Sequence, residues 1–276
     1  MNDRLSVRFW GVRGSIPCPG PDTVRYGGNT PCVEIRCGDR LLVFDGGTGI
    51  RPLGDRLMKR SGPIDADIFF SHCHVDHIGG LPFFAPFYGD KNSFRLWAGN
   101  LMPAYRMKQV MQILMSEPTF PIGIDTFRAQ MDYRDFTAGE TLSPQPGVTI
   151  KTGPLDHPGG ATGHRIDYAG RSVAYLTDNE KHDGEFSPAL LALARGADLA
   201  IYDCTFTDDE IQDKAGWGHS TWREGLRLAD AAGIKTFCLF HHAPEHDDAF
   251  MDGLVRQAQA VRPGTIAATE GLVIDL

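Results

Sequence analysis

Hydrophobic and polar positions form short strand-like runs in the first third of the chain. The runs are "LSVRFWGV" (5–12), "CVEIRC" (32–37), "RLLVFD" (40–45) and "DADIFFSH" (65–72). Alternation predicts strands with one buried face, and the nearly continuous apolar run in the last segment predicts a strand covered on both faces. Gly38-Asp39 lies between the second and third runs, which favours a hairpin turn there.

A second series of strand-like runs follows and is interleaved with helical segments. Strands are predicted over 147–157, 163–178, 197–203 and 236–242, with a hairpin signal at Ala169-Gly170 inside the second of these. Apolar spacing and capping residues predict helices over 187–196, 220–233 and 247–261. Two strand-rich halves, each with its own helices, favour an α+β fold in which two sheets pack face to face with helices outside.

The region from 90 to 135 has the least regular pattern. A helix is predicted over 103–115, where Pro103 lies near the first turn and Met107 and Met111 recur at helical spacing. The segment is rich in Met and Phe. It could cover a functional site, but packing into the core is the interpretation that we favour.

Composition narrows the class of protein. The chain has 276 residues, of which 42% are hydrophobic, and no Ser/Gly/Pro-rich linker divides it, so we expect one domain over 1–276. A net charge of −8 argues against a large nucleic acid as partner. No apolar leader or membrane-length apolar run is present, and the six cysteines lack CxxC spacing, so a cytoplasmic protein with reduced thiols is expected.

The segment "FFSHCHVDHIGG" places three histidines and an aspartate within His72 to His77. In an extended segment, residues two apart point the same way, so His72 and His74 can bind one ion together. If a helix begins next, Asp76 and His77 face elsewhere and can serve a second ion roughly 3.5–4 Å away. Imidazole and carboxylate donors suit zinc, and also manganese or iron.

The spacing His72-x-His74-x-Asp76-His77 resembles the HxHxDH signature of the metallo-β-lactamase superfamily. Further motifs of that family have counterparts in order: Asp45 in "LLVFDGGTG", His157 in "LDHPGG" and Asp178 in "VAYLTDNE". The resemblance implies a four-layer αβ/βα sandwich, with Asp45 supporting the ligand loop. The last ligand histidine is His241 or His242 in "TFCLFHHAPEHDD", and we favour His241 because it is the first polar residue after the apolar run.

The same resemblance implies how two divalent ions, most readily zinc, would be held. One ion would be bound by His72, His74 and His157. The other would be bound by Asp76, His77 and His241, with Asp178 bridging the two. Two ions that share a water molecule lower its pKa enough to supply hydroxide at neutral pH, which is hydrolytic chemistry. The sequence contains no GxSxG nucleophile motif.

The segment "DLAIYDCTFTDDEIQDKAGWGHSTWREG" resembles the ribonuclease Z and phosphodiesterase branch of the superfamily. There an acidic residue after a strand pairs with the histidine of an HST sequence, which corresponds here to Asp203 and His219. A carboxylate partner raises the proton affinity of histidine and suits it to protonate a leaving alkoxide. The alternative is that His219 only flanks a helix start. Asp76, Asp203 and His219 are therefore the candidate catalytic residues.

The opening segment, with "GVRGSIP" and "YGGNTPCVEI", resembles the first hairpin of phosphodiesterase-like bacterial relatives. Arg13 or Arg25 could contact a phosphate from this loop, although a structural role is the more common one for such arginines. No long basic arm is present for gripping a tRNA. The expected substrate is a small phosphodiester, nucleotide-like or cyclic, hydrolysed by a metal-bridging hydroxide, and a homodimer is expected.

Three other functions remain open. An acyl hydrolase acting on a lactone, thioester or β-lactam would use the same scaffold, although it has less need of a dedicated acid. A diiron redox role is disfavoured because relatives of that kind replace the second histidine of the signature with glutamate, whereas His74 is a histidine here. A metal-bearing module without catalytic activity is the third alternative.

Overall fold

The computed structural model describes residues 3–180 and 184–276, and in them two seven-stranded sheets form. The first sheet has the order β14-β1-β2-β3-β4-β5-β6. Its strands are β1 (Leu5–Gly11), β2 (Cys32–Cys37), β3 (Arg40–Phe44), β4 (Asp65–Phe70), β5 (Ser93–Ala98), β6 (Gln130–Asp135) and β14 (Val273–Asp275). The second has the order β13-β12-β11-β10-β9-β8-β7. Its strands are β7 (Thr141–Leu142), β8 (Thr149–Leu155), β9 (Ala161–Tyr168), β10 (Arg171–Leu176), β11 (Leu199–Asp203), β12 (Thr236–Phe240) and β13 (Ile266–Ala267).

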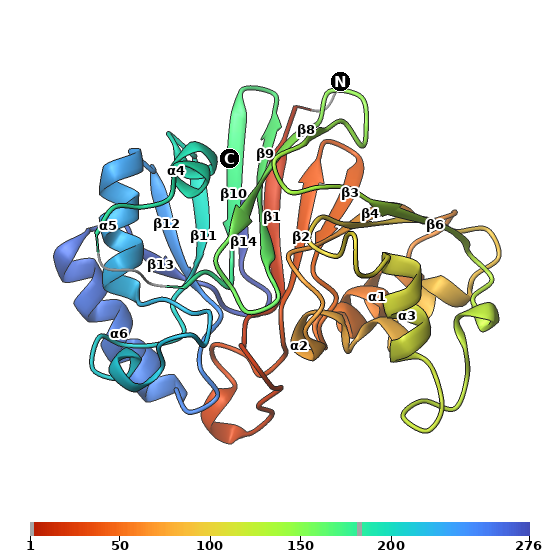
Figure 1. Ribbon diagram of the computed structural model, residues 1–276, viewed down its shortest axis with the longest axis horizontal. Helices are drawn as coiled ribbons and strands as arrows, with labels where there is room; N and C mark the ends of the chain where they lie inside the picture. The colour runs from red at the N-terminus through yellow and green to blue at the C-terminus, as the bar shows by residue number, and fades with distance from the viewer. Residues whose placement is uncertain (1–2, 181–183) are drawn as a thin grey trace.

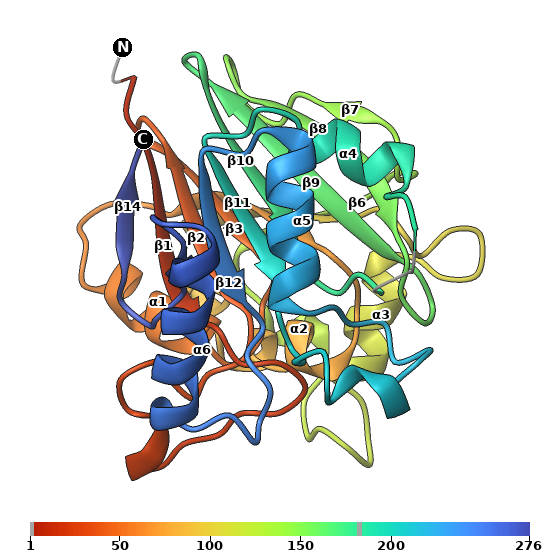
Figure 2. The ribbon, with the colours of Figure 1, turned by 90° about the vertical axis from the view of Figure 1, so that its left-hand side faces the viewer.

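Helices cover the outer faces of both sheets. Figure 1 shows the second sheet flanked by α4 (Pro188–Ala194), α5 (Trp222–Ala232) and α6 (Asp248–Val261), and the first by α1 (Ile50–Met58) and α3 (Met107–Leu114). In Figure 2, α5 and α6 lie in front of the second sheet. Short helical turns complete the structure: α2 (Val75–Ile78) and 3-10 turns at Pro21–Thr23, Leu81–Phe83, Ala85–Tyr88, Ile124–Thr126 and Ile211–Asp213. The predicted α+β four-layer sandwich is confirmed.

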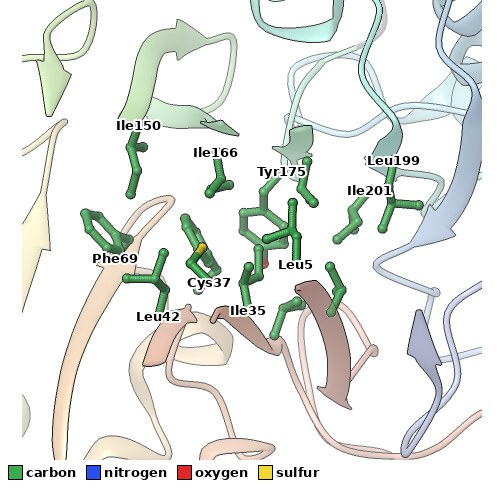
Figure 3. Packing of buried hydrophobic residues seen from close by; sticks show 14 of the residues in the cluster. Leu5, Ile35, Cys37, Leu42, Phe69, Ile150, Ile166, Tyr175, Leu199 and Ile201 are labelled. Atoms are coloured by element: carbon green, nitrogen blue, oxygen red, sulfur yellow. The ribbon is translucent and has the colours of Figure 1, made fainter. Parts of the chain in front are cut away.

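The central core lies between the two sheets, where apolar side chains from both inner faces meet (Figure 3). Phe44 of the first sheet stacks on Phe69 with ring centroids 5.3 Å apart, and it meets Tyr175 of the second sheet at 5.6 Å. Burial of such rings provides much of the free energy that holds two sheets together. The core therefore fixes the position of the strand ends on one sheet relative to those on the other.

The strands that carry the candidate site run parallel. β3 to β6 are parallel neighbours in the first sheet, and β10 to β13 are parallel neighbours in the second. The carboxyl ends of parallel strands meet at one edge of a sheet, which is where ligands of open α/β sheets bind. Figure 1 shows α2 at this end of the sandwich.

Both predicted hairpins are present, but several elements were not predicted. β2 and β3 pair antiparallel around Gly38, and β9 and β10 pair around Ala169 and Gly170. The elements without a predicted counterpart are α1, β5, β6, β7, β13 and β14, and α3 begins at Met107, four residues after the predicted start at Pro103. Within 90–135, Phe94, Leu96, Met107 and Met111 pack in the core under the first sheet, which supports the core-packing interpretation.

Two smaller expectations concern the cysteines and membrane segments. All six cysteines are free thiols in the structure. Among the helices in the described part of the chain, none combines the length and the apolar character that a bilayer crossing requires.

Candidate metal centre

The loop after β4 carries the histidine-rich motif. Ser71 and His72 follow the strand directly, and His74 immediately precedes α2, whose first turn contains Asp76 and His77. The change from extended chain to helix separates the four polar side chains into two sets, as the sequence predicted. All of them except His74 are buried or nearly so.

The first group of potential ligands consists of His72, His74 and His157. Nε2 of His72 lies 2.9 Å from Nδ1 of His74, and Nε2 of His157 lies 3.1 Å from the same atom. His157 follows β8 in the second sheet, so the group joins the two halves of the sandwich. Its three nitrogen donors lie close enough together to hold one ion.

The second group consists of Asp76, His77 and His241. Oδ2 of Asp76 lies 3.2 Å from Nε2 of His77 and 3.3 Å from Nε2 of His241, and the two imidazole nitrogens lie 3.3 Å apart. His241 is the residue directly after β12. His242, the alternative, points away and meets the carbonyl of Ala268 through Nε2 at 2.9 Å.

Asp178 lies between the groups. Its Oδ1 is 3.9 Å from Nε2 of both His72 and His157, and its Oδ2 is 3.3 Å from His77 and 3.4 Å from His241. One carboxylate therefore presents an oxygen to each group. All seven residues expected as ligands are brought together, and Asp178 has the position that a bridging ligand requires.

The donor set fits metal ions. Tetrahedral ligands that lie about 2.0–2.1 Å from one zinc ion are roughly 3.3 Å from each other, close to the separations seen here. The outward nitrogens of three histidines meet protein oxygens: His77 Nδ1 is 2.8 Å from Asp45 Oδ2, His157 Nδ1 is 2.8 Å from the Gly218 carbonyl, and His241 Nδ1 is 2.9 Å from Thr205 Oγ1. Such contacts fix the ring orientation and leave the inward nitrogen free for a metal.

Asp45 supports the histidine-rich loop, as the family resemblance implied. Its Oδ1 accepts the backbone N–H of Ser71 at 2.8 Å, and its Oδ2 accepts the Ser71 hydroxyl and lies against His77. Tyr175 from the second sheet donates its phenol to the same carboxylate at 2.7 Å. This contact was not foreseen, because nothing in the sequence distinguishes Tyr175 from an ordinary core residue.

Three site residues have an uncommon backbone conformation. Asp45, Asp178 and His241 have φ values of 60°, 59° and 62°, and each lies within two residues of a strand end. Left-handed backbone is unfavourable for residues other than glycine and persists where surrounding contacts fix it. Here the hydrogen bonds of the site supply those contacts, and the turn directs each side chain toward the cluster.

The electrostatics favour the metal-binding protonation states of His72, His74 and Asp178 but not that of His77. Burial would lower the pKa of His77, but the neighbouring carboxylates raise it well above its usual value. Burial, with repulsion from the neighbouring imidazoles, lowers the pKa of His72 and His74, which favours the neutral ring. Burial alone would raise the pKa of Asp178, but His241 and His77 lower it well below its usual value. Its carboxylate is therefore ionised and available as a ligand.

Asp203 and His219 form the predicted pair beside the cluster. Nδ1 of His219 lies 2.9 Å from Oδ2 of Asp203, and the His219 ring stacks 5.0 Å from that of His241. Burial would lower the pKa of His219, but the Asp203 carboxylate raises it to about 9. Among the described residues, Nε2 of His219 has no hydrogen-bond partner, so this atom is available to a ligand.

The two arginines considered for phosphate binding have structural roles instead. Arg13 is fully buried, and its guanidinium donates to the carbonyls of Gly27, Ala243 and His246. Arg25 pairs with Asp252 at 2.8 Å. Sequence could not reveal this, because Ala243, His246 and Asp252 lie more than 200 residues away from these arginines in the chain.

Comparison with known proteins assigns the family. Residues 40–242 match the family model described as Beta-lactamase superfamily domain. That range is most of the chain, so the protein belongs to this superfamily, as predicted. A ribonuclease Z from Gemmatimonas aurantiaca is 26% identical over an alignment of 333 residues, which covers 99% of this chain and 96% of the relative.

Solved structures have the same fold. The metallo-beta-lactamase fold protein YhfI from Bacillus subtilis gives a TM-score of 0.71 at 21% identity, covering 99% of this chain and 100% of the other. A diphosphatase from the PhnP family gives 0.71 at 20% identity, covering 99% and 97%. Together with the donor cluster, these relatives agree with the prediction of a metal-dependent hydrolase.

Proposed function

We propose that residues 1–276 form a single metallohydrolase domain that cleaves a small phosphodiester. His72, His74 and His157 would hold one divalent ion, Asp76, His77 and His241 a second, and Asp178 both. The donor set of imidazole and carboxylate suits zinc best, with manganese or iron as alternatives. When bound, such an ion pair supplies an activated water and neutralises charge on a substrate oxygen.

The observation that carries the proposal is the Asp203–His219 pair. Its 2.9 Å contact orients the imidazole so that Nε2 faces away from Asp203, with the His241 ring 5.0 Å from that of His219. An alkoxide leaves a phosphodiester only with difficulty unless it receives a proton, and His219 is placed to donate one from Nε2. Acyl substrates have less need of a separate acid, so the pair favours phosphodiester over lactone or thioester.

A small substrate is supported by the shorter length of this chain, which lacks segments that the related ribonuclease Z contains. The alignment with the ribonuclease Z spans 333 positions, whereas this chain has 276 residues, so the relative contains segments with no counterpart here. The net charge of −8 also disfavours a long polyanion. The relative's name denotes an enzyme of RNA, and for that reason an RNA substrate belongs in the test.

The test compares three substrate classes with the metal-loaded protein: bis(p-nitrophenyl) phosphate, a lactone and a thioester. We expect turnover of the diester, and activity confined to the acyl substrates would overturn the proposal. A precursor tRNA with a 3′ extension is assayed in parallel. Cleavage of the tRNA at a higher kcat/KM than any small diester would overturn the expected substrate size but not the reaction class.

The role of His219 is tested with His219→Ala on two diesters that differ in the leaving group. Loss of a general acid should reduce kcat about 100-fold or more for an alkoxide and much less for p-nitrophenolate, which leaves without a proton. Asp203→Asn should also reduce kcat more for the alkoxide than for p-nitrophenolate, but by a smaller factor. Metal content measured on each variant serves as the control, and equal losses on both diesters would contradict the acid role.

A further inference from the structure

Trp217 is unusually exposed for a tryptophan beside a candidate active site. Its side chain is 56% exposed, whereas the other three tryptophans of the chain, at positions 10, 97 and 222, are half-buried or buried. Covering an exposed aromatic ring with a ligand removes apolar surface from water, which favours binding. Trp217 lies two residues before His219, and the proposed acid role of His219 does not explain why the tryptophan is exposed.

The backbone on both sides of Trp217 is fixed to the metal cluster. The carboxylate of Glu180, two residues after Asp178, accepts the N–H of Gly216 at 2.9 Å and also the N–H of Gly218. The carbonyl of Gly218 in turn meets Nδ1 of His157 at 2.8 Å. The exposed indole therefore lies on a turn that hydrogen bonds hold in place, not on an unsupported loop. Such preorganisation reduces the entropy lost on binding.

An aromatic surface leads from Trp217 to His219. The ring of Phe206 lies 6.5 Å from that of Trp217 and 5.7 Å from that of His219, so a single ring separates the two. Nζ of Lys214 lies over one face of the indole, 4.1 Å from the ring centre, so a stacked ring would use the opposite face. A flat aromatic group next to a cation is typical of surfaces that bind nucleotides, where bases stack and phosphates meet positive charge.

We propose that Trp217 stacks on an aromatic ring of the leaving alcohol, and that this alcohol is a nucleoside. This inference rests on the proposed function, because it assumes that His219 donates its proton to the leaving oxygen. The group bonded to that oxygen then lies on the His219 side of the phosphorus, where Phe206 and Trp217 follow. Lys214 would contact a further phosphate or other anionic group on the nucleoside.

Binding is tested first, by tryptophan fluorescence of the metal-loaded protein. Adenosine 5′-monophosphate should quench the emission, and ribose 5-phosphate, which lacks the base, should not. Trp217→Phe should abolish the quenching, while the matched control Trp10→Phe should retain it, since Trp10 lies among Arg8, Glu34 and Arg56 in the first sheet. Quenching that persists in Trp217→Phe, or that ribose 5-phosphate reproduces, would overturn the proposal.

Kinetic measurements then test whether the ring that stacks on Trp217 belongs to the leaving alcohol. Two diesters of methyl phosphate are compared, one with the 5′-hydroxyl of adenosine and one with the 5′-hydroxyl of 1-O-methylribose, and product analysis identifies the alcohol that each releases. Trp217→Ala should raise KM for the first about 10-fold or more, in keeping with the usual strength of base stacking, and leave kcat/KM for the second within about 2-fold. Trp217→Phe should preserve most of the difference. Equal losses on both diesters would overturn the proposal.

The two hypotheses fail in different ways. If the wild-type protein hydrolyses neither diester, the proposed function fails. The fluorescence titration still decides whether Trp217 stacks on a base. If both diesters are hydrolysed but quenching by adenosine 5′-monophosphate is absent, the function stands and the stacking proposal fails.

Discussion

The phenol of Tyr175 donates a 2.7 Å hydrogen bond to the carboxylate of Asp45, and this contact joins the two sheets beside the proposed metal site. Burial and the Asp45 carboxylate raise the pKa of Tyr175 well above its usual value, so the phenol keeps the proton that it donates. Asp45 uses the same oxygen to orient His77. The orientation of His77, a proposed ligand in α2, thus depends on a residue of the second sheet.

Removing that hydroxyl should weaken both the fold and the site. Tyr175→Phe keeps the ring but leaves a buried carboxylate one donor short, and hydrogen bonds to charged groups contribute about 1.5 to 3 kcal/mol. We expect a loss of that size in the free energy of unfolding, measured in urea, and weaker metal binding. Tyr88→Phe is the control, since its phenol donates to a neutral carbonyl, that of Pro82. An equal effect of both substitutions on metal binding would contradict the coupling.

The two proposed ligand groups predict separate losses of metal. His157→Ala removes a donor of the first group only, and His241→Ala removes a donor of the second only. Each should lower the bound metal by about one equivalent, measured by elemental analysis, while the remaining ion stays. His242→Gln is the matched control, because His242 points away from the cluster and should keep full metal content. A loss in His242→Gln as large as that in His241→Ala would contradict the ligand assignment.

The elements that the sequence predicted are those whose apolar pattern is complete within the element. β4 and β11 are buried along nearly their whole length, and their sequences are apolar runs. β6, with sequence "QMDYRD", lies at the edge of its sheet and is only partly buried, so its apolar pattern is weak. α1 contains Pro52 and Gly54, both poor helix formers, and its burial against the first sheet overrides that preference.

Some site residues could likewise be predicted from local sequence, and others could not. His72 to His77 lie within six residues, so spacing alone indicated a metal site, whereas His157, Asp178 and His241 became credible only through the family resemblance. Thr205 and Glu180, which orient His241 and the turn around Trp217, have no local signal at all. Their roles depend on which strand ends lie side by side, and that is a property of the sheet order.

Gly218, in the turn before His219, allows a test of how this turn orients His157. A Cβ on Gly218 would lie 2.1 Å from Nδ1 of His157 and 2.4 Å from Pro158, so Gly218→Ala must displace the histidine. We expect metal affinity at the first group to fall by about 10-fold or more, measured by competition with a chelator. Gly216→Ala is a close control, because its φ of 82° matches the 83° of Gly218 but a Cβ there would meet nothing within 4 Å. If both variants lose metal equally, backbone strain and not contact with His157 is the cause.

The burial of His164 predicts that the protein loses stability in acid even when no metal is bound. The ring is fully buried among Phe44, Phe69 and Phe136, and neither nitrogen has a hydrogen-bond partner within the described part of the chain. Burial lowers the pKa of His164 from 6.5 to about 4. Between these values the unfolded chain binds a proton that the folded protein excludes. Stability is therefore fully present above pH 6.5 and falls as the pH drops toward 4, by about 3 kcal/mol in total.

Replacing the ring with one that cannot titrate should remove that part of the pH dependence. His164→Phe keeps an aromatic ring in an aromatic site and removes two buried nitrogens without partners, whose desolvation is unfavourable. We expect the free energy of unfolding of the metal-free protein to decline less steeply than that of the wild type between pH 6.5 and 4. Urea titrations at several pH values measure the difference. Parallel curves for the two proteins would mean that His164 is protonated, or reached by water, in the folded state.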